Sequence, residues 1–166
     1  MPTTPTLEQR TATAFVAIPS VVTMESMADV LPPLTSRLAS FLAQQGVEPS
    51  GPPFWRYTVI DMARALHVDV GFPLVDPIDA LADGIVAGEL PAGTYATTVH
   101  VGHPDGLLDA TRSLLEWGDD AGVTWDRADG PDGDVWACRL EEYLSDPAEE
   151  PDPTRWRTRL AFKLAD

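Results

Sequence analysis

The chain has 166 residues, of which 44% are hydrophobic, so it is long enough for one domain with a sizeable core. Its 26 acidic and 11 basic residues give a formal net charge of −15, which repels phosphate backbones and argues against direct nucleic-acid binding. No apolar run approaches the roughly 20 residues that span a bilayer, and the start MPTTPTLEQRT lacks the features of a signal peptide. We therefore expect no membrane partner and a cytoplasmic location.

The acidity has two explanations that charge alone does not separate. It can serve solubility only, or it can enrich cations near the surface. The single cysteine, Cys138, has no partner in the chain for a disulfide or a zinc site, so we expect it to be a small buried residue.

The first predicted elements are a strand and a helix. Residues 11–23 are rich in β-branched and small apolar side chains and predict a strand in which Pro19 marks a bulge or an edge. Apolar residues then recur at three- and four-residue intervals over residues 27–45 and predict a helix with a stop at Gly46. Pro32 and Pro33 fall in its first turn if the helix starts near Asp29.

Two more strands and a loop complete the first half. The segments FWRYTVI (54–60) and HVDVGFPL (67–74) read as strands joined by a turn. Residues 75–84 contain three aspartates and predict a connecting loop. The first half is therefore expected to have the order β-α-β-β.

The second half repeats that order. Strands are predicted from IVAGELP (85–91) and TYATTVHVG (94–102), and a helix capped by Asp105 is predicted to run to about residue 121 and to end at Gly122. Two further strands follow, from VWACRLEEYL (135–144) and WRTRLAFKL (156–164), with an acidic, proline-rich loop between them.

The helix positions of the two halves also match in sequence when the second half is displaced by 76 positions. The matched pairs are Leu31 with Leu107, Leu38 with Leu114, Phe41 with Trp117, Gly46 with Gly122 and Val47 with Val123. We therefore predict an α+β fold of two β-α-β-β repeats, at about 11–75 and 85–164, within a single domain, 1–166. Paired around a pseudo-twofold axis, the antiparallel sheets would have helices on one side and a ligand cleft on the other.

Strand alternation selects residues that would line this cleft. In the run 135–144, Trp136, Cys138 and Leu140 are expected on the core face. The opposite face carries four residues: Ala137, Arg139, Glu141 and Tyr143. It directs a carboxylate and a phenol into the same space beside a guanidinium, so these residues are candidate ligand contacts.

The tetrapeptide FWRY (54–57) places three aromatic rings in four residues, more than one sheet face needs for packing. Trp55 and Tyr57 share one side of that strand and are further candidates for the cleft. Aromatic residues at strand spacing also occur in ordinary cores, so the packing role and the binding role both stay open at this point.

Other motifs give no site. His100 and His103 lie near a strand end without a third ligand, so we expect no metal. The sequence has no GxSxG nucleophile motif. The glycine-rich stretch DGPDGD (129–134) lacks the lysine of a phosphate loop and reads as a solvent turn, so no cofactor is expected.

The segments FWRYTVIDM, HVDVGFPL, ELPAGTYATTVHVGHPDGL and LEEYLSDPAEEPDPTRWRTRLAFKL resemble the GyrI-like small-molecule-binding domain, the effector-binding domain of bacterial multidrug-sensing transcription activators. The resemblance extends from about Ala12 to Leu164. Its most specific part is a glutamate two positions before a tyrosine, followed by a short acidic and proline-containing loop, here Glu141, Tyr143, Asp146 and Pro147.

The resemblance implies an aromatic cleft between the repeats with a buried glutamate that pairs with lipophilic cations. Glu141 and Tyr143 match by motif, and Tyr57 and Trp55 by their place in FWRY. The adjacent Glu142 departs from the apolar residue often found there, and strand parity favours Glu141 as the inward acid. Only about ten residues precede the first expected strand, which is too few for a helix-turn-helix, so the chain resembles a stand-alone member.

Three functions remain open from the sequence. The first is binding or sequestration of an aromatic, cationic small molecule. The second is a hydrolase that opens cyclopropane-bearing DNA-alkylating toxins in the same cage, with Glu141 and Tyr143 as catalytic residues, because a subset of similar stand-alone members has this activity. The third is a protein-interaction module, because some relatives are associated with gyrase inhibition. The oligomeric state is not determined by the sequence.

Overall fold

The structure of the protein is a computed structural model that describes residues 3–79 and 81–166. Met1 and Pro2, in the expected domain 1–166, and Ala80, in the expected loop 75–84, lie outside the described residues. The first half contains β1 (Thr6–Arg10), β2 (Thr13–Val22), α1 (Met27–Gln44), β3 (Phe54–Ile60) and β4 (Leu66–Leu74). The second half contains β5 (Val86–Leu90), β6 (Gly93–Val101), α2 (Leu107–Ala121), β7 (Arg127–Gly130), β8 (Gly133–Trp136), β9 (Arg139–Tyr143) and β10 (Arg157–Lys163). Short 3-10 turns precede α2, at Pro104–Gly106, and β10, at Pro153–Arg155.

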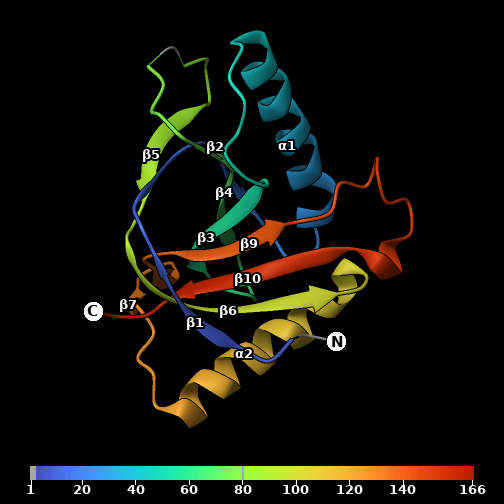
Figure 1. The fold of residues 1–166 in the computed structure, drawn as a ribbon. Helices are drawn as coiled ribbons and strands as arrows, with labels where there is room; N and C mark the ends of the chain where they lie inside the picture. The colour runs from blue at the N-terminus through green and yellow to red at the C-terminus, as the bar shows by residue number, and fades with distance from the viewer. Residues whose placement is uncertain (1–2, 80) are drawn as a thin grey trace.

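The strands form one curled antiparallel sheet whose order is symmetric about its centre. The order is β1-β6-β10-β9-β3-β4-β2-β5, with β7 and β8 added beside β3. Outward from the central β9–β3 pair, the strands β9, β10, β6 correspond to β3, β4, β2, and each set belongs to one β-α-β-β unit. Figure 1 shows β9, β10 and β6 side by side, with α1 above and α2 below them. The predicted α+β fold of two such units is confirmed.

The outer strands are exchanged between the two units. β1 precedes the first unit but pairs with β6 of the second, and β5 precedes the second unit but pairs with β2 of the first. Both pairings are antiparallel, with Thr6 opposite Thr97 and Thr13 opposite Leu90. Each unit therefore completes the sheet of the other.

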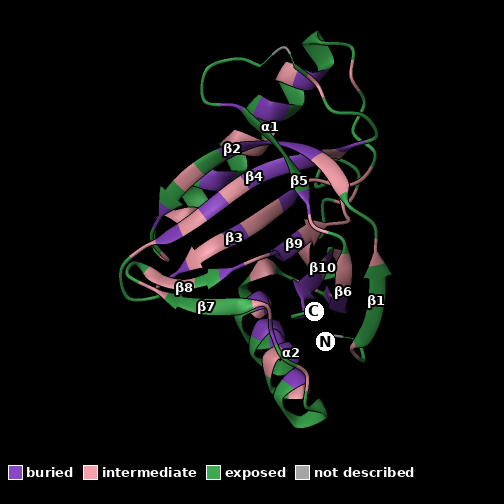
Figure 2. Ribbon diagram, turned by 90° about the vertical axis from the view of Figure 1, so that its left-hand side faces the viewer, coloured by how far each residue is buried: buried purple, intermediate pink, exposed green. Residues whose placement is uncertain are grey.

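The two faces of the sheet have separate cores. On one face, Leu31 of α1 and Leu107 and Leu114 of α2 pack in one cluster with Tyr57 and Phe162 of the sheet. The other face buries Phe15, Phe54, Tyr95, Cys138 and Leu140 within the curl of the sheet. Cys138 is buried, as predicted. Figure 2 shows that burial is concentrated in the central strands, whereas β1 and β7 are mostly exposed.

The predicted strands at 11–23, 54–60, 67–74 and 156–164 agree closely with β2, β3, β4 and β10. Pro19 lies on an edge, as predicted, because β5 pairs only with residues 13–17 of β2. Gly122 ends α2 in a left-handed conformation with φ 76°, also as predicted. None of the helices in the described ranges is long and apolar enough to cross a membrane.

Three expectations about the elements were wrong. α1 begins at Met27, as in the predicted range, and not near Asp29, so Pro32 and Pro33 lie in its second turn. The residues just before α1 fix where the helix begins, because the Met27 N–H donates to the Thr23 carbonyl and the Thr23 N–H donates to Ser26 Oγ. Asp105 does not cap α2, since it lies in the preceding 3-10 turn, where its own N–H donates to His103 Nδ1.

The predicted strand 135–144 was the third error. It is interrupted at Ala137 and Cys138 into β8 and β9. Because the break resets the alternation of side chains, Trp136 lies in the helix-side core, whereas Cys138 and Leu140 lie in the core of the opposite face. The expectation that Trp136 shares a face with those two residues was therefore wrong.

Candidate ligand-binding site

A cavity of about 600 Å³ opens between the first turns of the two helices and the central strands β3 and β9. This volume lies within the range of about 300 to 1,000 Å³ that is common for small-molecule sites. The cavity lies on the face of the sheet that the helices cover. The sequence led us to expect the cleft on the side opposite the helices. That expectation was wrong, because Phe15, Phe54 and Tyr95 help fill that face.

The walls of the cavity follow the internal symmetry. Residues 76 positions apart line it from the two helix starts: Met27 and His103, Ala28 and Pro104, and Pro32 and Leu108. The floor is formed by the two central strands, where Trp55 of β3 lies directly opposite Glu141 of β9. The cavity thus lies where the two units meet.

Glu141 has one oxygen that is fully engaged and one that is not. Its Oε1 accepts hydrogen bonds from Tyr57 Oη at 2.6 Å and Tyr143 Oη at 2.8 Å. No hydrogen bond reaches Oε2 from any residue in the described ranges. The residue is only 9% exposed. Burial raises the pKa of the carboxyl, although the two phenols and the Arg139 charge act in the opposite direction.

Aromatic rings surround this carboxylate. The rings of Trp55 and Tyr143 meet edge to face with their centroids 4.8 Å apart, a favourable aromatic geometry. Trp55 is also held from α1, because its Nε1–H donates to Thr35 Oγ1 at 3.4 Å. Phe162 of β10 adds a further ring to the lining.

Arg139 lies two residues before Glu141 on β9 and lines the same cavity. Its guanidinium carbon lies 5.0 Å from the ring centroid of Trp136 and 4.7 Å from that of Phe162. Such cation-π contacts hold a guanidinium in place without using its N–H donors. Burial lowers the pKa of Arg139 to about 10, while the negative charge of Glu141 raises it.

Of the six site residues predicted from the sequence, five line the cavity: Trp55, Tyr57, Arg139, Glu141 and Tyr143. Ala137 is not among the lining residues. It lies at the break between β8 and β9, where its carbonyl accepts from Arg56 Nη2 at 2.7 Å and its N–H donates to the Asp126 carbonyl at 3.0 Å. The structure therefore gives Ala137 a backbone role in the turn.

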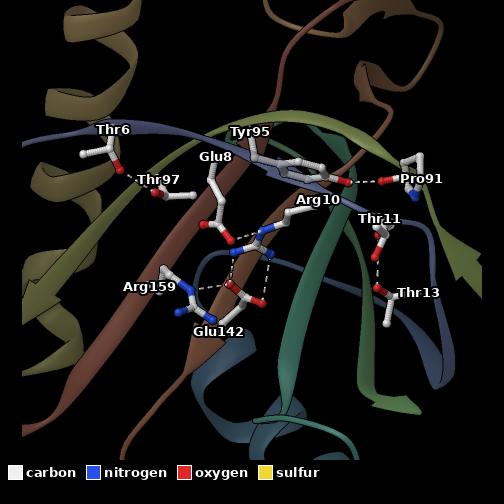
Figure 3. Close-up of polar contacts among 10 residues, drawn as sticks. All are labelled: Thr6, Glu8, Arg10, Thr11, Thr13, Pro91, Tyr95, Thr97, Glu142 and Arg159. Carbon is white, nitrogen blue, oxygen red and sulfur yellow. Dashed lines mark hydrogen bonds and ion pairs between the residues drawn. The ribbon is translucent and has the colours of Figure 1, made fainter. Parts of the chain in front are cut away.

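Glu142, the adjacent acid, lies on the other face of the sheet (Figure 3). Its Oε1 accepts from Arg10 Nη2 at 2.9 Å and from Arg159 Nε at 2.8 Å. Arg10 also forms an ion pair with Glu8. Although burial acts against ionisation, the hydrogen bonds and charges of the two arginines lower the pKa of Glu142. Alternation within β9 separates the two acids, whereas the parity counted from Trp136 does not carry across the break at Ala137 and Cys138.

The part of the lining outside β3 and β9 was not anticipated. Its contributors include Met24, Met27, Met62, His103, Leu108 and Phe162. The displacement of 76 positions that aligned the helices also aligns lining residues of the two walls, such as Met27 with His103. The sequence therefore held a signal from which the second wall could have been predicted. Within residues 3–79 and 81–166, no group of three or more His, Cys, Asp or Glu side chains is arranged to hold a metal ion.

A family model described as the GyrI-like small molecule binding domain matches residues 3–165. The chain belongs to this family. Several solved structures share its fold at low sequence identity. The EcmrR C-terminal domain has 17% identity and a TM-score of 0.74, with 98% of both chains covered. EcmrR in its DNA complex has a TM-score of 0.76 at 17% identity, and this chain, covered to 98%, spans 57% of that longer chain.

Two further solved structures share the fold. SAV2435 bound to tetraphenylphosphonium has 8% identity and a TM-score of 0.66, with 98% of this chain and 94% of SAV2435 covered. A hydrolase from Listeria innocua has 13% identity and a TM-score of 0.62, with 97% of this chain and 91% of the hydrolase covered. At these identities the likeness extends to the fold alone. No curated protein sequence matches the chain.

Proposed function

We propose that this protein binds flat, lipophilic aromatic cations in the cavity between the two helix starts, and so senses or sequesters them. The observation that carries the proposal is the Glu141 carboxylate, which is 9% exposed, has Oε1 occupied by two phenols and leaves Oε2 without a partner among the described residues. A positive group on a ligand would supply that partner.

Energetics favour a delocalised cation over a small hydrated one. An unpaired buried carboxylate is unfavourable by several kcal/mol, and a flat aromatic cation loses little hydration when it enters. The rings of Trp55, Tyr143 and Phe162 offer stacking area, and cation-π attraction adds about 0.5 to 2 kcal/mol for each ring. The net charge of −15 also raises the local concentration of cations.

The test is a fluorescence titration of 9-aminoacridine, a flat aromatic cation, into the wild type and the Glu141→Gln variant. Removing the charge while keeping the shape should weaken binding about tenfold or more. The matched control is Glu142→Gln, which removes the adjacent acid on the other face and should leave the affinity unchanged. Equal affinities of the wild type and Glu141→Gln would rule out the proposed role of Glu141.

A second candidate is hydrolysis of a strained electrophile, such as a cyclopropane-bearing DNA-alkylating toxin, in the same cavity. Two features of the site favour it: burial that raises the pKa of the Glu141 carboxyl, the direction that makes the carboxylate a stronger base, and the two tyrosine hydroxyls within 2.8 Å of Oε1. In this reaction Glu141 takes a proton from water and the water oxygen bonds to a ring carbon. The ring C–C bond at that carbon breaks, its electron pair passes to the conjugated carbonyl of the toxin, and the carbonyl oxygen takes a proton from a phenol such as Tyr143, which regains one from Glu141.

Product analysis separates the two candidates. The protein is incubated with an excess of a cyclopropane-bearing alkylator, and ring-opened product is counted per protein molecule. Many turnovers that are lost in Glu141→Gln support the hydrolase. Binding of one equivalent without product supports the binding protein.

A further inference from the structure

Arg139 presents hydrogen-bond donors that the protein itself does not use. The residue is 9% exposed and lines the cavity. Its side chain makes no hydrogen bond and no ion pair with any residue in the described ranges, although Glu141 is on the same face of the strand. Its nitrogen atoms are also not among the fully enclosed polar atoms that lack a partner, so they remain reachable from the cavity.

The surroundings keep this guanidinium where it is. It packs against the rings of Trp136 and Phe162, while Glu141 directs Oε1 to the phenols of Tyr57 and Tyr143. A guanidinium has five N–H donors in a planar fork that matches carboxylate and carbonyl oxygens. Leaving such donors unpaired in a nearly closed site is unfavourable, because the donors have lost water and gained no acceptor.

Building on the proposed function, we propose that the ligand also carries an oxygen acceptor, a carbonyl or a carboxylate, that binds the Arg139 guanidinium while its cationic part meets Glu141. The spacing limits the shape of such a ligand. The two residues are two positions apart on one strand face, and a rise of about 3.3 Å per residue separates their Cα atoms by about 7 Å. This is close to the width of a fused ring system, so the predicted ligand is a dipolar aromatic molecule rather than a simple lipophilic cation.

The experiment compares three dyes with one ring system: 9-aminoacridine, its 4-carboxamide and its 4-carboxylic acid. The first lacks an oxygen, the second adds a carbonyl and the third adds a carboxylate. With the wild type, at least one derivative should bind about tenfold to a hundredfold more tightly than 9-aminoacridine, the range expected for a charge-assisted hydrogen bond. The carboxamide and the carboxylate arms separate a neutral acceptor from an anionic one.

The variants assign that gain to Arg139. In Arg139→Gln each derivative should lose its advantage, so that its affinity, measured relative to that of 9-aminoacridine in the same variant, falls to about that of the parent dye. Thermal unfolding of the variant and of the wild type checks that the fold is retained. Arg139→Lys keeps the charge but not the fork, and should retain only part of the gain.

The outcomes are distinguishable from those of the proposed function. If 9-aminoacridine binds and depends on Glu141, but neither derivative gains affinity, or the gain persists in Arg139→Gln, the role of Arg139 is wrong and the binding function stands. If none of the three dyes binds, both proposals are wrong.

Discussion

Glu141 and Glu142 are consecutive residues of β9, yet their carboxylates lie on opposite faces of the sheet and have pKa values shifted in opposite directions. Glu141 meets two phenols in the cavity, whereas Glu142 meets Arg10 of β1 and Arg159 of β10 (Figure 3). The contacts of Glu141 with the phenols leave its negative charge available to a ligand. The contacts of Glu142 with the arginines neutralise its charge and join β9 to β1 and β10.

Glu142→Gln should destabilise the fold at neutral pH, by about 1 to 3 kcal/mol, because it leaves Arg10 and Arg159 without their shared anion. The pKa of Glu142 is lowered in the folded state, so its contribution is present above the unfolded pKa of about 4.3 and is lost as pH falls through the folded value. Urea unfolding of wild type and variant at neutral and acidic pH measures the gap. A gap that stays constant with pH would contradict this role.

Binding of 9-aminoacridine should weaken on acidification, starting at a higher pH than an ordinary glutamate would give. The pKa of Glu141 is raised by burial, and its protonation removes the charge that attracts the cation. His103 and Asp105 also line the cavity, so the control is the same titration on Glu141→Gln. A wild-type profile parallel to that of the variant would show that the titrating group is not Glu141.

Tyr57→Phe and Tyr143→Phe should each move that binding midpoint to higher pH. Both phenols donate to Glu141 Oε1 and stabilise its ionised form, so removal of either hydroxyl makes the carboxyl easier to protonate. Tyr95→Phe is the matched control, because its hydroxyl donates to the Pro91 carbonyl away from the cavity. Equal midpoints in all three variants would contradict the assigned hydrogen bonds.

Gly118→Ala should destabilise the protein by about 1 to 3 kcal/mol, although alanine favours a helix by about 1 kcal/mol relative to glycine. A Cβ at this position of α2 would overlap the ring of Trp125, which packs against Trp136 and Phe162. Thermal unfolding checks this, with the exposed Ser113→Ala in the same helix as the control. A stabilised Gly118→Ala would show that the ring moves aside at little cost.

The sequence predicted most of the fold because the central elements have strong periodic patterns. Residues 54–60 are rich in aromatic and β-branched side chains and coincide with β3, and Leu107 and Leu114 mark the buried side of α2. β1 was not predicted because its sequence, TLEQR, is largely polar and exposed. Its place depends on pairing with β6, far along the chain, and no local pattern encodes such a contact.

Part of the candidate site could also be predicted from the sequence, because β9 has a regular pattern. Parity along β9 placed Arg139, Glu141 and Tyr143 together, because no irregularity interrupts that short strand. It failed for Trp136, because the break at Ala137 and Cys138 is not marked by glycine or proline. The side of the sheet on which the cavity opens depends on how far apart the two helices lie, and that distance is set by tertiary packing.

The exchange of β1 and β5 joins each half of the chain to the sheet of the other half. The walls of the cavity belong to different halves, so a hinge that moved them apart would also strain the β1–β6 and β2–β5 ladders. We therefore expect the backbone of the sheet and helices to stay rigid. Ligands of different shape would be accommodated by rotamer changes of side chains that line the cavity. Met24, Met27 and Met62 are the unbranched, polarizable side chains positioned for that adjustment.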